Sequence, residues 1–273
     1  MPLSEKPKTS AAGEAWNVYY RNKDLPWLDN DAQTSESLRR FADSEWISIV
    51  LNYAIGFSAP IKSILEAGCG SGRYGIALAL KGYDVTAFDY NQGSVDLCRI
   101  LSAKCNNLRA FLKYSCYANN ILEIDQDTDK YDLCFNQAVL EYFQEDDFKK
   151  ALKEMVRVTR IGGAVAVILQ HTAHPFKWYW QLCGWKGFLN QPKVHSVSPE
   201  LLRKALFDEG LKNIVIDGIY PWKSLFFPFR PEPNTFLHEL VYFIGEFLTR
   251  YVPLPRFIRS HIALQIVGMG IKA

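Results

Sequence analysis

Apolar positions along the chain change their spacing repeatedly from about residue 60 onward. Short, nearly continuous apolar runs alternate with segments in which apolar residues return every three to four positions. The first pattern is typical of buried strands and the second of amphipathic helices. We predict strands at 63–68, 84–89, 113–118, 130–137, 162–170, 212–220 and 261–273, and helices at 35–55, 72–82, 92–106, 146–160 and 198–210.

This alternation predicts an α/β fold with a doubly wound, Rossmann-like sheet of seven mostly parallel strands. Parallel strands need crossover connections, and these place helices on both faces of the sheet. Such sheets bind ligands beyond the carboxyl ends of their strands, at the switch point beside the first strand. We therefore look for the site in the segment that follows residues 63–68.

Composition excludes several functions. The 273 residues are 48% hydrophobic and 22% charged, with a formal net charge of +2, which favours a globular chain without a nucleic-acid partner. The N-terminus carries no apolar signal segment, so we expect a cytoplasmic protein. The apolar stretch 236–254 is interrupted by charged residues and should not span a membrane, although peripheral contact stays open. The six cysteines show no metal-ligand spacing, so we expect reduced thiols and no metal site.

A glycine-rich loop follows the first strand and allows two interpretations. Gly70, Gly72 and Gly75 fit G-x-G-x-x-G, and Asp89 lies 19 residues after Gly70, near the offset of a ribose-binding acid in a dinucleotide fold. On this pattern the chain would be an NAD-dependent oxidoreductase. The fold of such enzymes commonly continues with a second nucleotide-binding half, but the chain contains no second glycine fingerprint.

The alternative unit, Glu66-Ala-Gly68-Cys-Gly70-Ser-Gly72, closely resembles the first motif of class I S-adenosylmethionine-dependent methyltransferases. Four later segments resemble further motifs of that family in the same order: "VTAFDYNQGSVDLC", "YDLCFNQAVLEYF", "ALKEMVRVTRIGGAVAVILQ" and "HSVSPELLRKALFDEGLKNIVI". The last is similar to its ubiquinone- and menaquinone-type branch. The resemblance covers about residues 60–220 and implies that the final strand is antiparallel.

The resemblance also implies a set of cofactor-binding residues. The backbone of Gly68, Gly70 and Gly72 would contact S-adenosylmethionine, and the product would be S-adenosylhomocysteine. Glu66 would organise the loop or reach the amino-acid tail through water, and Asp89 would accept both ribose hydroxyls. Family position adds the remaining candidates: Tyr90 and Asn91 beside the adenine, Asn120 and Ile121 in its slot, with Asn119 as an alternative register, and Asn136 and Gln137 at the methyl-transfer site.

Catalytic candidates follow from the reaction. Methyl transfer is an in-line displacement, and it needs a general base only if the nucleophile arrives protonated. His171 is the base candidate, with a structural histidine as the alternative. Tyr142 stands where this branch often has histidine, and it would line the pocket or pack in the core.

We expect four parts along the chain: a disordered tail at 1–13, a helical cap over the site at 14–60, a core at 61–220 and 261–273, and an insertion rich in proline and aromatic residues at 221–260 as a substrate lid. Aromatic residues in the cap, the lid and 176–185 favour a small hydrophobic or aromatic acceptor, methylated on O, N or C. A polar acceptor between these segments and a non-catalytic cofactor-binding protein stay as alternatives. Nothing in the sequence indicates an oligomeric state.

Overall fold

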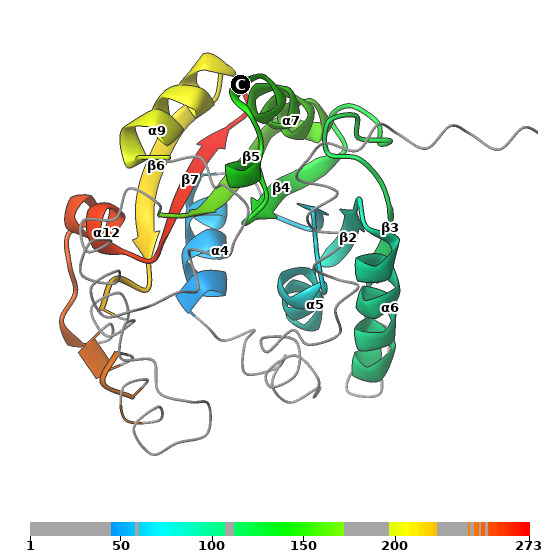
Figure 1. The fold of residues 1–273 in the computed structure, drawn as a ribbon, viewed down its shortest axis with the longest axis horizontal. Coiled ribbons are helices and arrows are strands. Elements are labelled where there is room, and N and C mark those ends of the chain that lie inside the picture. The colour runs from blue at the N-terminus through cyan, green and yellow to red at the C-terminus, as the bar shows by residue number, and fades with distance from the viewer. Residues whose placement is uncertain are drawn as a thin grey trace, which may run out of the picture.

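The central sheet of the computed structural model contains seven strands in the order β3-β2-β1-β4-β5-β7-β6 (Figure 1). The structure describes residues 45–57, 60–106, 112–171, 197–222, 240, 243–245, 247–248 and 251–273. The strands are β1 (Ser63–Ala67), β2 (Asp84–Asp89), β3 (Tyr114–Ala118), β4 (Tyr131–Gln137), β5 (Thr159–Gln170), β6 (Lys212–Ile219) and β7 (Gln265–Ile271).

The direction of the strands confirms the predicted Rossmann-like sheet. β1 pairs in parallel with β2 and β4, β2 with β3, and β4 with β5, whereas β7 is antiparallel to both β5 and β6. The chain moves outward from β1 to β3 and then returns to the other side of β1 with β4. The switch point therefore lies at the carboxyl ends of β1 and β4, where the glycine loop follows β1.

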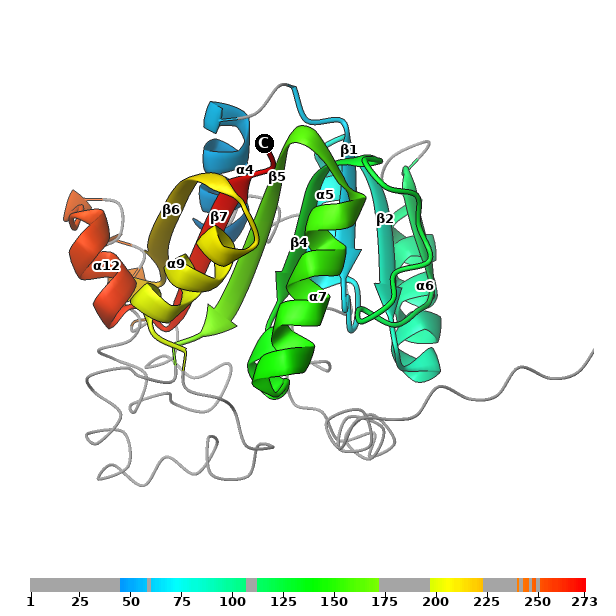
Figure 2. The ribbon, with the colours of Figure 1, turned by 90° about the horizontal axis from the view of Figure 1, so that it is seen from above.

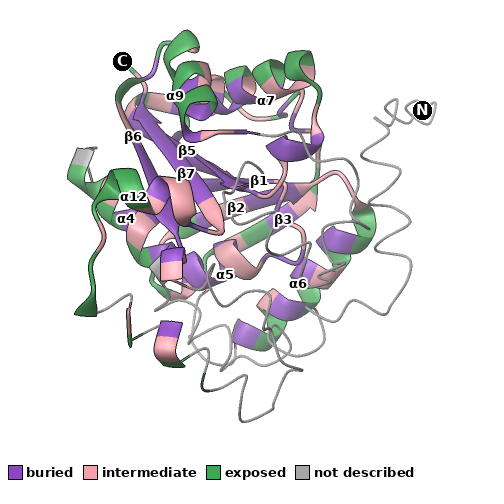
Figure 3. Ribbon diagram, turned by 60° about the vertical axis from the view of Figure 1, so that its left-hand side comes forward, coloured by how far each residue is buried: buried purple, intermediate pink, exposed green. Residues whose placement is uncertain are grey.

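Helices cover both faces of the sheet (Figures 1 and 2). On one face α4 (Glu45–Phe57) and α5 (Arg73–Leu80) pack over apolar residues of the central strands, with α6 (Gln92–Asn106) beside them. On the other face lie α7 (Glu145–Val158) and α9 (Pro199–Asp208), with the short helix η1 (Leu140–Tyr142) after β4. Figure 3 shows the result, with buried strands in the centre and exposed residues on the outer sides of the helices.

Two predicted boundaries are wrong. The predicted helix 146–160 ends at Val158, and β5 begins at Thr159 rather than at residue 162. The Thr159 hydroxyl donates to the Met155 carbonyl (2.7 Å), and the Thr159 backbone is extended, which ends the helix. The predicted strand 261–273 begins only at Gln265, because its first residues close helix α12 (Arg256–Ile262). A Cβ on Gly218 would lie 2.1 Å from the Arg259 carbonyl, so the missing side chain of β6 lets α12 pack there.

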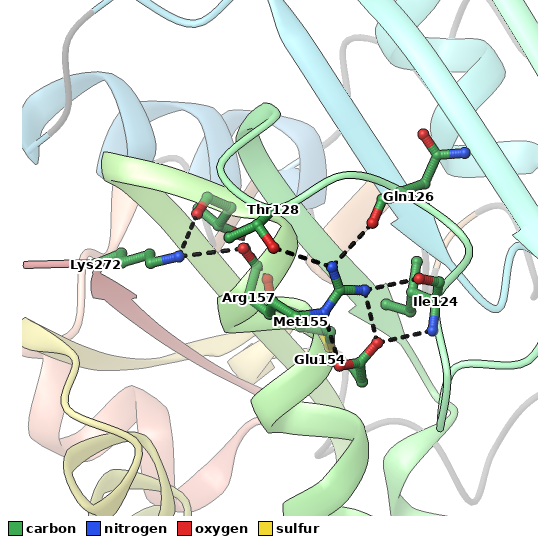
Figure 4. Close-up of polar contacts among 8 residues, drawn as sticks. Ile124, Gln126, Thr128, Glu154, Met155, Arg157 and Lys272 are labelled. Carbon is green, nitrogen blue, oxygen red and sulfur yellow. Dashed lines mark hydrogen bonds and ion pairs between the residues drawn. The ribbon is translucent and has the colours of Figure 1, made fainter.

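A polar network fixes the connection between β3 and β4 (Figure 4). The guanidinium of Arg157, in the last turn of α7, donates to the carbonyls of Ile124 (2.7 Å) and Gln126 (2.9 Å) and to the carboxylate of Glu154. Glu154 in turn accepts from the Ile124 amide (2.8 Å). The segment that carries the predicted adenine slot is therefore anchored to α7.

Parts of the predicted organisation fall outside the described residues: the tail 1–13, most of the cap, 176–185 and much of 221–260. Of the predicted helix 35–55, residues 45–55 form most of α4. Among the described residues, no helix has both the length and the apolar character needed to cross a bilayer.

Candidate functional site

The loop between β1 and α5 adopts a backbone that favours glycine at three positions. The φ angles of Gly68, Gly70 and Gly72 are 80°, 53° and 77°. The Phe88 carbonyl, near the end of β2, accepts from the amides of Gly68 (2.9 Å) and Cys69 (2.8 Å). The loop therefore turns at the carboxyl edge of the sheet while bound to the neighbouring strand.

Glu66 lies beneath this loop and faces α5. Its carboxylate is 1% exposed and accepts from the Gly75 amide (2.9 Å) in the first turn of the helix. A Cβ on Gly75 would lie 2.3 Å from that carboxylate and 2.9 Å from the Tyr114 ring. Gly75 thus allows close packing of Glu66 and Tyr114 against the first turn of α5. Burial raises the pKa of Glu66 well above its usual range.

Asp89 ends β2 with both carboxylate oxygens held by backbone amides. Oδ2 accepts from Gly70 (2.8 Å) and Oδ1 accepts from Asn91 (2.9 Å). Burial raises the pKa of Asp89, and the two amides act in the opposite direction. Each carboxylate oxygen can accept two hydrogen bonds, so these contacts leave acceptor capacity on both oxygens. The side chain is partly exposed, which suits a ligand at this edge.

Two predicted adenine contacts, Asn91 and Asn120, also form hydrogen bonds with the backbone of their own turns. Asn91 is the N-terminal cap of α6, because its side-chain oxygen accepts from the Ser94 amide (3.1 Å). The side-chain oxygen of Asn120 accepts from the Leu122 amide (3.0 Å), and the Asn119 amide donates to the Asp89 carbonyl (3.0 Å). The structure therefore places these residues at one edge together with Asp89. Tyr90 is partly exposed beside them, and Ile121 is buried.

The end of β4 carries two buried amides. The Gln137 side-chain oxygen accepts from the indole N–H of Trp46 in α4 (2.6 Å). Asn136 is fully buried, and neither its oxygen nor its nitrogen has a hydrogen-bond partner among the described residues. A buried amide without partners is costly, which makes Asn136 a polar group available to a ligand. Trp46 was not predicted from the sequence, because no spacing relates it to residue 137.

The short helix after β4 contains Tyr142, which is buried, and a second acid that sequence analysis overlooked. Glu141 is fully buried, and its Oε1 accepts from the Gln170 amide (3.3 Å). Burial raises the pKa of Glu141 to about 8, so its neutral form prevails at neutral pH. A single acid within an apolar motif gives no local signal of such burial.

His171 directly follows β5 and is only 3% exposed. Its Nδ1 lies 3.2 Å from the Ala263 carbonyl, so the neutral ring donates from Nδ1. Burial lowers the pKa of His171 to about 4. A base of such low pKa accepts protons weakly at neutral pH, and the packing is that of a histidine with a structural contact. Its role as a base stays a prediction.

Three cysteines that are distant in sequence meet beneath the loop: Cys69 in the loop, Cys98 in α6 and Cys116 in β3. Their sulfur atoms all lie within 4.8 Å of one another. Spacing along the chain does not indicate this cluster, since the three residues belong to separate elements.

Comparison with known proteins identifies the domain built around this site. A family model for a methyltransferase domain matches residues 64–163. The chain is 31% identical over 100 residues to TehB of Haemophilus influenzae, described as a probable S-adenosyl-L-methionine-dependent methyltransferase, covering 37% of this chain and 33% of that protein. Residues 64–163 are thus similar to a methyltransferase domain. Nothing in the comparisons selects the ubiquinone- and menaquinone-type branch, which stays a prediction.

Two further matches cover larger shares of the chain. The malonyl-[acyl-carrier protein] O-methyltransferase of Salmonella typhimurium is 30% identical over 140 residues, covering 50% of this chain and 49% of that protein. The chain thus spans about a third of the length of TehB and about half the length of the Salmonella typhimurium protein. Geranyl diphosphate C-methyltransferase from Streptomyces coelicolor superposes with a TM-score of 0.61 at 16% identity, over 98% of this chain and 100% of that structure, which shows a shared fold.

Proposed function

We propose that the chain transfers a methyl group from S-adenosylmethionine to a small acceptor. The observation that carries this proposal is the geometry of Asp89, whose two oxygens are oriented by the amides of Gly70 and Asn91 beside the glycine loop. The family match to residues 64–163 supports it. The cofactor would be held at the switch point between β1 and β4.

The donors and acceptors at this edge suit a ligand of this kind. A ribose diol needs one acceptor for each hydroxyl, and Asp89 offers capacity on both oxygens. The fully buried amide of Asn136 has donors and an acceptor that find no partner in the described part of the chain. The chain contains no second glycine fingerprint for a second nucleotide-binding half, which favours S-adenosylmethionine over NAD.

When bound, S-adenosylmethionine supplies an electrophilic methyl group on a sulfonium. The chain's own residues then have positioning roles. Gly68, Gly70 and Gly72 allow the backbone to approach the ligand closely, and Asp89 fixes its orientation. The neutral forms of Glu141 and His171 add no charge near the ends of β4 and β5, which suits an acceptor that arrives without a proton to remove.

We propose that the acceptor is hydrophobic or aromatic. The described part of the segment before α12 exposes Phe243, Phe247 and Tyr251, with ring centroids 6.4 Å and 4.7 Å apart along this row. An apolar surface of this kind suits contact with a lipophilic molecule. A polar acceptor is the alternative. A non-catalytic cofactor-binding protein would need only the residues that bind the cofactor.

Calorimetry with S-adenosylhomocysteine, S-adenosylmethionine and NAD tests the cofactor. We expect binding of the first two and none of NAD, and binding of NAD alone would refute the proposal. A panel of apolar and polar acceptors, assayed for formation of S-adenosylhomocysteine, then tests the acceptor class. Tight cofactor binding without turnover of any acceptor would favour the non-catalytic alternative.

A further inference from the structure

We propose that Cys69, Cys98 and Cys116 form a binding site for one thiophilic divalent ion of the zinc and cadmium class. The three side chains come from the glycine loop, from α6 and from β3, and all three are buried. This site is distinct from the proposed cofactor site, because the ion would lie beneath the loop on the side of α6.

The distances between the sulfur atoms fit a single ion. The Sγ atom of Cys69 lies 3.6 Å from that of Cys116 and 4.0 Å from that of Cys98. A Zn–S bond of about 2.3 Å in tetrahedral geometry separates two thiolate sulfurs by about 3.8 Å. The observed distances lie on either side of that value, so an ion could bind with little movement of the backbone.

The surroundings suit a thiolate cluster. The Tyr114 hydroxyl lies 2.7 Å from the Cys98 sulfur and can donate to it. The Arg99 side chain donates to the Cys116 carbonyl (3.2 Å), which places a positive charge beside the third ligand. Binding of a divalent ion would release three thiol protons to solvent and leave one net negative charge, which Arg99 offsets.

Gly72 shows how closely the cluster packs against the loop. A Cβ at this position would lie 2.2 Å from the Cys98 sulfur and 2.6 Å from the Tyr114 oxygen. Cys69 itself stands between Gly68 and Gly70. An ion shared by the three thiolates would therefore fasten the loop to α6 and β3, and its affinity should be coupled to that of a ligand on the loop.

The test is a titration of the fully reduced, metal-free chain with Cd²⁺ in the absence of oxygen. The thiolate-to-cadmium absorption band and elemental analysis report the stoichiometry. We expect one ion per chain, lost in Cys98→Ala/Cys116→Ala and in the milder Cys116→Ser. Cys105→Ala is the matched control, because Cys105 is also a buried cysteine of α6 but lies outside the cluster. It should bind Cd²⁺ as the wild type does.

Two outcomes would overturn the site: no absorption band in reduced wild type that is folded by circular dichroism, or equal binding by the double variant. Titration of the metal-free chain with S-adenosylhomocysteine separates this proposal from the proposed function. Loss of that binding with Cd²⁺ binding retained would count against the cofactor site alone.

Discussion

Replacement of Asp89 by asparagine tests the central feature of the site. The carboxylate accepts one backbone N–H on each oxygen, from Gly70 at 2.8 Å and from Asn91 at 2.9 Å. Asparagine has only one oxygen, so in either orientation of the amide one of these N–H groups faces an NH₂ group. Loss of one hydrogen bond to a charged group costs about 1.5–3 kcal/mol. In a chain of this size that lowers the melting temperature by roughly 3–5 °C.

The same change removes the negative charge that we propose to hold the ribose hydroxyls. A similar loss of about 1.5–3 kcal/mol would weaken binding of S-adenosylhomocysteine by about 10- to 100-fold. Calorimetry at neutral pH measures the affinity, and thermal unfolding measures the stability of the same samples. Asp84→Asn is the matched control, because Asp84 is exposed at the opposite end of β2. It should change neither quantity.

The two readouts separate the two roles of Asp89. If Asp89→Asn binds S-adenosylhomocysteine within about twofold of the wild type, Asp89 does not hold the cofactor and our interpretation of β2 is wrong. If the melting temperature also stays unchanged, loss of one of the two amide contacts costs less than about 1.5 kcal/mol.

Two further predictions concern buried groups. Glu141→Gln should remove a pH dependence of the free energy of unfolding. Burial raises the pKa of Glu141 from 4.5 to about 8, so its contribution to stability is fully present below pH 4.5 and is lost as pH rises to about 8. Between pH 5 and 8 the free energy of unfolding of the wild type should fall by about 1.4 kcal/mol per pH unit relative to that of the variant, as measured by chemical denaturation. The control is Glu123→Gln at an exposed position. Plots of unfolding free energy against pH that run parallel for the wild type and Glu141→Gln would contradict this prediction. Gly75→Ala should destabilise by about 1–3 kcal/mol, because its Cβ would meet Glu66 and Tyr114. Gly56→Ala, where nothing lies within 4 Å of a Cβ in α4, should be neutral or stabilising by up to about 1 kcal/mol; equal melting temperatures of the two variants would refute the packing argument.

Sequence patterns predicted the parts of the site that depend on residues close together in the sequence. The glycine loop and Asp89 each sit at a strand end, and parallel strands bring their carboxyl ends to one edge, so adjacency in the sheet follows from the order of elements. The contact between Trp46 and Gln137 joins residues 91 positions apart, and no periodicity encodes it. The thiol cluster likewise depends on how α6 lies over β3. The start of β7 was misplaced because the apolar residues 262–264 fit a helix or a strand, and packing of α12 on Gly218 decides between them.

The position of β7 has a consequence for synthesis of the chain. β7 comes last in the sequence among the described strands, yet it lies between β5 and β6, and β6 pairs with no other strand. While residues 265–271 are still within the ribosome, β6 has no strand partner and β5 presents an open edge with Val165, Val167 and Leu169. Exposed apolar edges of this kind invite pairing with other chains. Nascent chains stalled before residue 265 has left the ribosome should therefore depend on chaperones more than chains in which residue 271 has emerged.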